Sequence, residues 1–277
     1  MLISRPLTVF LKAMTLGLAD NVDRDRSLVD INMSTVEKVS AKIQNQLLAA
    51  LPQNEFDAIE PSLKLVDLEM DQVLWEMDEK RKHIYFPTTV MICMLYDTED
   101  GNSIEVGMTG RQGMVGIVTF VGDARMAKRA VVMNPGQAYV MEAKYAEKFF
   151  EELPCFQEIC LCYTQTLIVQ LSQSIICNRL HSIEQQLCRY LLIYNDTLQS
   201  TVFNLTQARI SQVLGVRRES VSLAATQLQE KGLIKRTRGK IELLDRQGLL
   251  TTTCECYGVV KEQNERILGK YFSRYNA

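Results

Sequence analysis

Residues 203–245 read FNLTQARISQVLGVRRESVSLAATQLQEKGLIKRTRGKIELLD, and this stretch decides the fold of the C-terminal part of the chain. Thr206 is a candidate N-cap for a short helix with Ile210 and Leu214 on its apolar face. Gly215 follows, and glycine tolerates the positive φ that a tight turn between two helices requires. The stretch therefore begins with a helix and a glycine turn.

A second helix is predicted from about Arg217 to Lys231, and Gly232 ends it. Its inward positions are Val221, Ala225 and Leu228, and its outward positions are Arg218, Glu219, Ser222 and Gln229. LIKR and KIELL then predict two short strands around the basic turn TRG. Together these elements predict a winged helix-turn-helix, whose second helix fits the major groove of DNA. An αα-hairpin packed inside a larger fold is the alternative.

Charge is unevenly distributed along the chain. Residues 204–246 contain nine basic and four acidic side chains, a net charge of +5. Since the whole chain carries −2, the remainder carries −7. A basic module on an acidic remainder is typical of a protein that binds DNA through one domain.

Length and composition agree with a two-domain globular protein. The chain has 277 residues, of which 47% are hydrophobic and 23% charged. Its eight cysteines are far fewer than a disulfide scaffold needs, and none forms a C-x-x-C, so we expect reduced thiols and a cytoplasmic protein. No uninterrupted apolar run reaches the roughly 18–20 residues that span a bilayer, so no membrane partner is expected.

The N-terminal part divides into an extension and two helices. Residues 1–33 are predicted to be a disordered extension or the product of an upstream start; the first 19 faintly resemble a signal peptide, which Lys12 interrupts. Residues 34–51 predict an amphipathic helix, and a short helix follows near 53–60. The first helix has Ser34 or Thr35 as its cap and Val39, Ile43, Leu47 and Leu51 at a spacing of four.

Short strand-like runs then dominate residues 62–142. They read LKLVDL, VLWEM, HIYFP, VMICMLY, SIEVGM, MVGIVTF, RAVVM and AYVME, and glycine, asparagine and aspartate turns separate them. This pattern predicts an antiparallel, jelly-roll-like β-roll as the effector or sensor domain, within residues 34–150. The fold class is therefore α+β.

A long helix is predicted within residues 151–195, which also contain a hinge. Its 3-4 spaced positions form a heptad seam: Leu161, Thr164, Ile168, Leu171, Ile175 and Asn178. We expect this seam to hold a homodimer together; a single helix buried within one chain is the alternative.

The last segments are the winged helix-turn-helix, at 196–250, and a C-terminal tail, at 251–277. Cys254 and Cys256 lie in the tail. Two thiols supply only half of a zinc site, so we expect a structural tail and no metal.

The chain resembles the CRP/FNR family of bacterial transcription regulators. Two stretches carry the resemblance: the 43 residues quoted above, and RQGMVGIVTFVGDARMAKRAVV with its Gly-x-x-Gly. The resemblance covers roughly residues 34–250. It implies a homodimer that binds double-stranded DNA at a palindromic operator, and it leaves RNA polymerase open as a further partner.

The resemblance also implies roles for single residues. The family's base-reading pair falls on Arg218, which can bind guanine, and Glu219, which can accept from cytosine; Ser222 can add a contact. Thr206, Arg217, Arg238 and Lys240 are expected to contact phosphates. Many relatives carry another arginine where this chain has Leu223, so we expect a different operator.

The effector domain departs further from the family. Ile117 stands where cyclic-nucleotide-binding relatives carry a ribose-binding glutamate, so we expect no cyclic nucleotide. A pocket for another anion is predicted from Gly113, Gly116, Arg125, Lys128 and Arg129, with solvated charge as the alternative.

Other cofactors and activities are not expected. The oxygen-sensing relatives hold an iron–sulfur cluster on N-terminal cysteines, and this chain has no cysteine before Cys93. His83 lies in a strand-like run and offers no convincing haem ligand. No motif pairs a nucleophile with a base, so we expect no enzyme. The competing hypothesis is a small-ligand sensor that acts through protein–protein contacts and has weak or lost DNA binding.

Overall fold

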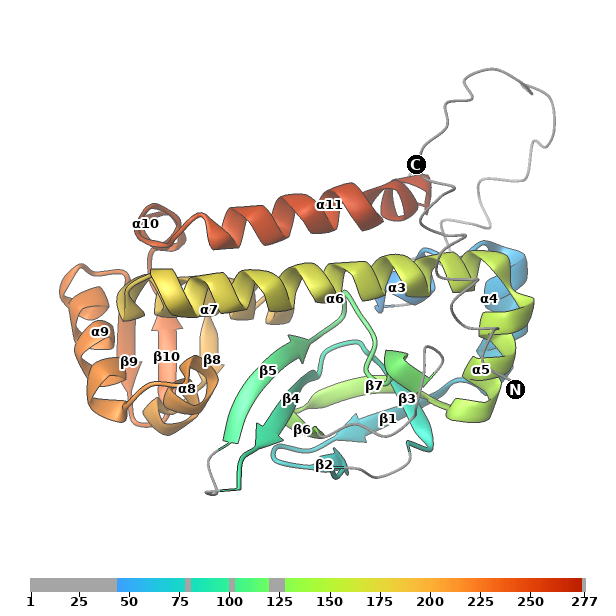
Figure 1. Cartoon of the computed structure of the whole chain (residues 1–277), viewed down its shortest axis with the longest axis horizontal. Helices are drawn as coiled ribbons and strands as arrows, with labels where there is room; N and C mark the ends of the chain where they lie inside the picture. The colour runs from blue at the N-terminus through green and yellow to red at the C-terminus, as the bar shows by residue number, and fades with distance from the viewer. Residues whose placement is uncertain (1–43, 78–80, 100–102, 120–127, 276–277) are drawn as a thin grey trace, which may run out of the picture.

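The computed structural model describes residues 44–77, 81–99, 103–119 and 128–275, and it has three parts (Figure 1). A β-roll lies below a long pair of helices, α6 (Pro154–Leu180) and α7 (Ile183–Leu198). A small domain with its own sheet lies at one end of this pair, and α11 (Cys256–Tyr275) runs alongside α6. The α+β class predicted from the sequence is confirmed.

The described N-terminal part contains two short helices, α3 (Gln46–Ala49) and α4 (Gln53–Ile59), followed by the 3-10 turn η1 (Glu60–Ser62). The prediction of one continuous helix up to residue 51 is wrong at Asn45, which is extended and caps α3 through its side chain. Asn45 also donates to the carbonyls of Pro87 and Gly113, which anchors α3 on the roll. The expected cap at Ser34 or Thr35 and residues 1–33 lie outside the described residues.

The roll consists of two antiparallel sheets. One has the strand order β1-β7-β3 and the other β2-β6-β4-β5. Their bounds are β1 Lys64–Leu68, β2 Val73–Trp75, β3 His83–Pro87, β4 Met91–Asp97, β5 Ser103–Thr109, β6 Arg129–Asn134 and β7 Gly136–Glu142. Alternation of inward and outward side chains along these strands buries Ile84 and Phe86 from one sheet and Ile92 and Val132 from the other.

One of the eight predicted strands is absent. Within the run MVGIVTF, the described residues 114–119 form only an isolated bridge, between Val115 and Tyr85, and then the 3-10 turn η2 (Ile117–Thr119). Gly116 has φ +108, a value that a strand cannot continue through, and it turns the chain so that Ile117 enters the core. Apolar composition alone could not distinguish this turn from a strand.

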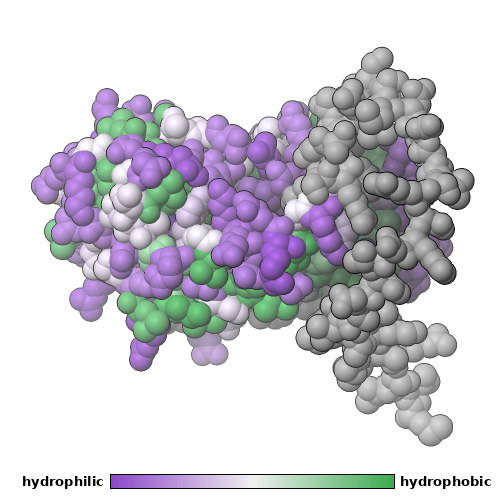
Figure 2. Space-filling view, turned by 90° about the horizontal axis from the view of Figure 1, so that it is seen from above, coloured by the Kyte–Doolittle hydropathy of each residue, from purple (hydrophilic) through white to green (hydrophobic). Residues whose placement is uncertain are grey.

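Helix α5 (Ala143–Glu152) leads from the roll into α6. By length and composition alone α6 could cross a membrane, a property that long packing helices of globular proteins share. Here it packs against α5, β5 and α11. Hydrophobic residues also reach the surface in several patches on the face seen from above (Figure 2).

The C-terminal domain is built on α7. Leu187, Leu191 and Tyr194 of this helix are fully buried in one hydrophobic cluster with Ile210 and Leu228. The domain therefore begins near residue 183, earlier than the boundary at 196 that the sequence suggested. Its other elements are β8 Val202–Asn204, α8 Gln207–Leu214, α9 Arg218–Glu230, β9 Ile234–Thr237, β10 Lys240–Leu243 and α10 Arg246–Thr252.

The C-terminal segment, predicted only as a tail, contains the 20-residue helix α11, antiparallel to α6. Contacts at both ends fix this direction: Gln173 donates to Cys256, and Lys270 pairs with Glu158. Buried Ile267, Leu268 and Tyr271 join the cluster under α6.

Candidate nucleic-acid interface

Helices α8 and α9 form the predicted helix-turn-helix. Thr206 caps α8 by accepting from the backbone N–H of Arg209 at 3.2 Å. Gly215 ends α8 with φ +64, the left-handed conformation that glycine adopts without a steric penalty. These two local signals, both predicted from the sequence, set the geometry of the turn.

Helix α9 has one buried face and one exposed face. Val221, Ala225 and Leu228 are buried, whereas Arg218 and Glu219 are exposed, as predicted. The helix spans Arg218–Glu230, one residue shorter at each end than expected. Arg217 is its N-cap position but makes no side-chain cap hydrogen bond, so its guanidinium extends into solvent.

Two more side chains lie on the exposed side of α9. Ser222 is half-buried, and its hydroxyl accepts from Gln207 of α8 at 3.4 Å. Leu223 is 63% exposed, which is unusual for a leucine on a helix that otherwise packs well. Arg218, Glu219 and Leu223 are therefore exposed on this face, whereas Ser222 is only partly so.

The wing is a three-stranded sheet with the order β8-β10-β9. Arg236 of β9 fixes the wing to α9, because its guanidinium donates to Thr226 Oγ1 at 2.9 Å. In Figure 1 the β9–β10 turn and α8 lie at the same end of the domain, and α10 lies at the other. The wing and the start of α9 thus present one surface.

The nine basic residues of residues 204–246 fall into two groups. Four have partners inside the protein: Arg209 with Asp71, Lys231 with Glu184, Arg236 with Thr226, and Arg246 with Asp196. The other five are exposed, and their side chains have no hydrogen bond or ion pair within the described part of the chain. They are Arg217, Arg218, Lys235, Arg238 and Lys240. All five lie at the start of α9 or on the wing, and we call them the free basic surface.

Helix α8 contacts the roll on the side that faces away from the free basic surface. The Arg209 guanidinium donates to the Asp71 carboxylate, in the turn before β2, and to Met133 of β6. A small open pocket lies at this junction, lined by Arg129, Arg209 and Gln212 among other residues. Met91 and Cys93 of the roll belong to the same hydrophobic cluster as the C-terminal domain. The two domains therefore share a continuous interface.

Glu105 of β5 lies at this domain interface. Burial raises the pKa of its carboxyl group to about 7, and a hydrogen bond from Cys93 opposes this rise. Tyr190 and Tyr194 of α7 and Arg209 of α8 act electrostatically on the same cluster. A carboxyl group that titrates near neutral pH therefore sits between the roll and the C-terminal domain.

The residues of the predicted anion pocket have separate roles in the structure. A Cβ at Gly113 would come within 2.2 Å of the Tyr163 hydroxyl, so this glycine lets the roll approach α6 closely. Arg129 pairs with Asp97 at 2.7 Å and lines the pocket at the domain interface. Lys128 is half-buried, and Arg125 lies outside the described residues. The anion pocket itself stays a prediction.

All six seam positions lie on α6. Leu161 and Thr164 are half-buried, whereas the four later positions are exposed, with Ile175 at 71%. Helix α11 contacts other residues of α6, including Glu158 and Gln173. Within the part of the chain that the structure describes, the seam face is thus left uncovered.

Sequence reasoning missed one cluster. The structure places Cys177 and His181 beside Cys254 and Cys256, although the two pairs are more than 70 residues apart in the sequence. The sequence contains Cys177-x-x-x-His181 at the end of the long helix, a spacing that can hold a metal ion. Only the packing of α11 on α6 shows that Cys254 and Cys256 complete the cluster.

A β-roll joined by a long helix to a winged helix-turn-helix defines a class of DNA-binding regulators. Two family models match the chain, and together they cover more than half of it: a cyclic nucleotide-binding domain over residues 65–153 and a Crp-like helix-turn-helix domain over residues 185–252. The chain belongs to the CRP/FNR family. It is a DNA-binding transcriptional regulator and not an enzyme, as predicted.

Solved structures of this family share the fold. FixK2 from Bradyrhizobium japonicum has a TM-score of 0.61 and 16% identity, over 69% of this chain and 98% of that chain. A CRP/FNR-family transcriptional regulator from Thermus thermophilus has a TM-score of 0.56 and 18% identity, over 68% and 97%. CLP from Xanthomonas campestris, a c-di-GMP-responsive regulator, has a TM-score of 0.55 and 9% identity, over 70% of this chain and 100% of that chain. No curated protein gave a significant match.

Proposed function

We propose that this regulator binds a palindromic DNA operator as a homodimer and reads its sequence with α9 in the major groove. The observation that carries the proposal is the free basic surface. Five exposed cations, unpaired within the described residues, lie at the start of α9 and on the wing, where the negatively charged phosphates of a duplex would lie.

Base reading is assigned to the exposed face at the start of α9. Arg218 can donate two hydrogen bonds to guanine, and Glu219 can accept from cytosine. Ser222, one turn later, can contact either kind of group. Leu223 adds an apolar contact, for which the methyl group of thymine is the matching partner.

Phosphate contacts are assigned to Thr206, Arg217, Arg238 and Lys240. All four are exposed, and the last two lie on the wing, where they can reach the backbone beside the groove. Such contacts position the protein without selecting a sequence.

The homodimer is assigned to the seam face of α6. Ile168, Leu171 and Ile175 are 53%, 39% and 71% exposed in one chain, and exposed isoleucine and leucine at heptad spacing favour a second helix as partner. Two copies joined along α6 would present two α9 helices to successive turns of one DNA face.

The effector of this protein is proposed to differ from the cyclic nucleotides for which its roll domain is named. Ile117 is buried in the roll core, where an apolar side chain cannot accept a hydrogen bond from a ribose hydroxyl. CLP responds to c-di-GMP, a cyclic dinucleotide, so regulators of this fold are not limited to cyclic mononucleotides.

Selection of binding sites from random duplexes, with the purified full-length chain, tests the operator. We expect a two-fold symmetric site with half-sites about one helical turn apart, roughly 10 base pairs, and an affinity that falls steeply with salt. Repeating the selection with a panel of metabolites reports effector dependence. Binding without sequence preference would contradict the proposal and favour a sensor that acts through protein contacts.

The substitution Ile175→Lys tests the seam. We expect monomers and much weaker operator binding, because a lysine in the seam brings two charges together in an apolar contact. Gln165→Lys, at an exposed α6 position outside the seam, is the matched control and should stay dimeric. An Ile175→Lys variant that remains dimeric on sedimentation analysis would refute this dimer.

A further inference from the structure

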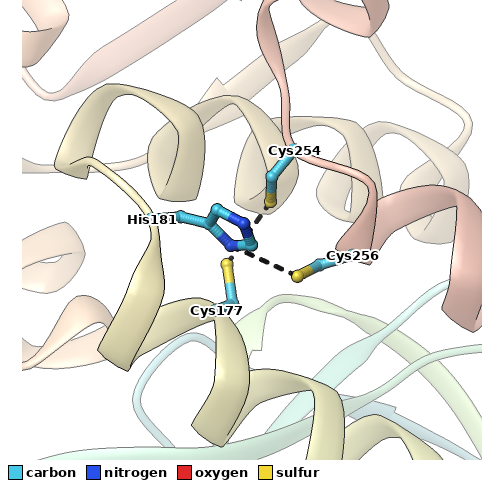
Figure 3. Close-up of side chains that lie close together, drawn as sticks. All are labelled: Cys177, His181, Cys254 and Cys256. Carbon is cyan, nitrogen blue, oxygen red and sulfur yellow. Dashed lines mark hydrogen bonds between the residues drawn. The ribbon is translucent and has the colours of Figure 1, made fainter.

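The junction between α6 and α7 holds a cluster of four side chains that the DNA-binding function does not use (Figure 3). Cys177 lies in the last turn of α6, and His181 follows that helix directly. Cys254 and Cys256 lie where α10 is joined to α11. One ligand atom from each residue lies within 4.8 Å of all the others.

We propose that Cys177, His181, Cys254 and Cys256 form a structural zinc site that fastens the α6–α7 junction to the α10–α11 junction. Three thiolates and one imidazole are a donor set that Zn²⁺ takes in closed, four-coordinate structural sites. Soft thiolate ligands in a tetrahedral arrangement favour zinc over the hard cations Mg²⁺ and Ca²⁺.

The distances in the cluster agree with tetrahedral coordination. With Zn–S bonds of about 2.3 Å and a Zn–N bond of about 2.0 Å, a regular tetrahedron separates two sulfurs by about 3.8 Å and sulfur from nitrogen by about 3.5 Å. The structure has Cys177 Sγ and Cys254 Sγ 3.6 Å apart, and Cys256 Sγ and His181 Nδ1 3.4 Å apart. These two separations match the tetrahedral values, and none of the others exceeds 4.8 Å.

Burial distinguishes this cluster from scattered surface thiols. Cys177, Cys254 and Cys256 are at most 4% exposed, and they form a small cluster of their own. A disulfide between Cys177 and Cys254 would need their sulfurs to approach to about 2.05 Å, and it would leave Cys256 and His181 without a role.

Neighbouring groups orient the ligands as zinc sites require. Nε2 of His181 lies 3.3 Å from Oε1 of Glu255, so a proton on Nε2 leaves Nδ1 facing the sulfurs. Gln173 donates from Nε2 to Cys256 Sγ at 3.1 Å. The buried guanidinium of Arg189 acts electrostatically on Cys177 and would offset the single negative charge of a zinc ion with three thiolates.

The position of the site determines its role. Helix α7 is part of the C-terminal domain, whereas α6 carries the proposed dimer seam. An ion bound here would hold α11 and α10 to the end of α6, and so would fix how the C-terminal domain leaves the dimer helix. The ion would join these two junctions whichever operator the protein binds.

Metal analysis of the full-length protein, purified with a thiol reductant and supplied with Zn²⁺, tests the proposal. We expect one zinc per chain, and Co²⁺ in its place should give the absorption of a tetrahedral thiolate complex. Cys256→Ser should lose both signals. Cys162→Ser, the same change on α6 away from the cluster, should keep them.

A milder variant covers the case in which Cys256→Ser does not fold. Glu255→Gln is exposed and changes only the partner of His181, so it should fold and bind zinc about 10–100-fold more weakly in competition with a chelator. Wild-type protein that binds no zinc or Co²⁺, binding that Cys256→Ser leaves unchanged, or a Cys177–Cys254 disulfide in place of the metal would each overturn the proposal.

Discussion

The C-terminal domain presents basic residues on two sides, and the sides differ in what those residues contact. Toward α7 and the roll, Arg209, Lys231 and Arg246 each have an acidic partner. On the free basic surface, Arg217, Arg218, Lys235, Arg238 and Lys240 have none within the described residues. The net charge of +5 is a sum over the whole segment 204–246, so it does not show which side binds DNA. The pairing of the charges does, because a cation already paired to a carboxylate has less to gain from a phosphate.

The largest test of this difference is Arg218→Ala. We expect binding to weaken by about 1–3 kcal/mol at one base pair of the selected operator, since a guanidinium that binds guanine twice discriminates by that amount. Measuring affinities for operators with each base at that position gives the value. Equal loss for every operator would show that Arg218 contacts phosphate only.

The next test concerns Glu105, on the paired side. Its folded pKa of about 7 lies above the ordinary value of 4.5, so the folded state binds the proton more tightly. Its contribution to stability is therefore greatest below pH 4.5, falls as the pH rises toward 7 and is constant above that. At about 1.4 kcal/mol for each pKa unit, the change is on the order of 3 kcal/mol.

Glu105→Gln should remove this part of the pH dependence because the amide stays neutral. The difference in Tm between about pH 5 and about pH 7.5 should then be smaller than in the wild type. An unchanged difference would mean that Glu105 is solvated at the interface.

A smaller effect is expected for Arg246→Ala. Arg246 donates to Asn195, Asp196 and the Tyr257 hydroxyl, and these contacts hold α10 and α11 to α7. Their loss should lower the free energy of unfolding by about 1 kcal/mol, because the pair is partly exposed. Urea unfolding measures this, and operator preference should not change. A changed preference would place Arg246 in the DNA interface.

The smallest effect belongs to Lys240→Ala on the wing. We expect a uniform loss of affinity across operators and a decrease of about 1 in the slope of log affinity against log salt, as for one lost phosphate contact. Lys231→Ala, on the paired side, should leave the slope unchanged. Equal slopes for both variants would remove the distinction between the two sides.

The winged helix could be predicted in detail because its signals are local. A cap at Thr206, a glycine at position 215 and the apolar spacing of α9 act within a few residues of the structure that they determine. The faces of α9 and the exposure of Arg218 and Glu219 followed from the same spacing.

Features that depend on distant contacts could not be predicted in this way. The run at 114–120 has the composition of a strand, but the positive φ of Gly116 and the core position of Ile117 place a 3-10 turn at Ile117–Thr119 instead. Likewise, the sequence shows Cys254 and Cys256 as two thiols, and only the packing of α11 on α6 adds Cys177 and His181.

Helix α11 packs along α6 and restricts bending at the joint between α6 and α7. It begins beside Cys177, next to the break at His181, and contacts α6 as far back as Glu158. Because α11 lies beside this joint, the C-terminal domain cannot rotate by a bend at residues 181–182 alone. Any rotation must also slide α11 along α6 or break the contacts between the two helices. Motion of the DNA-binding domain is thereby converted from a free rotation into a shear between two long helices.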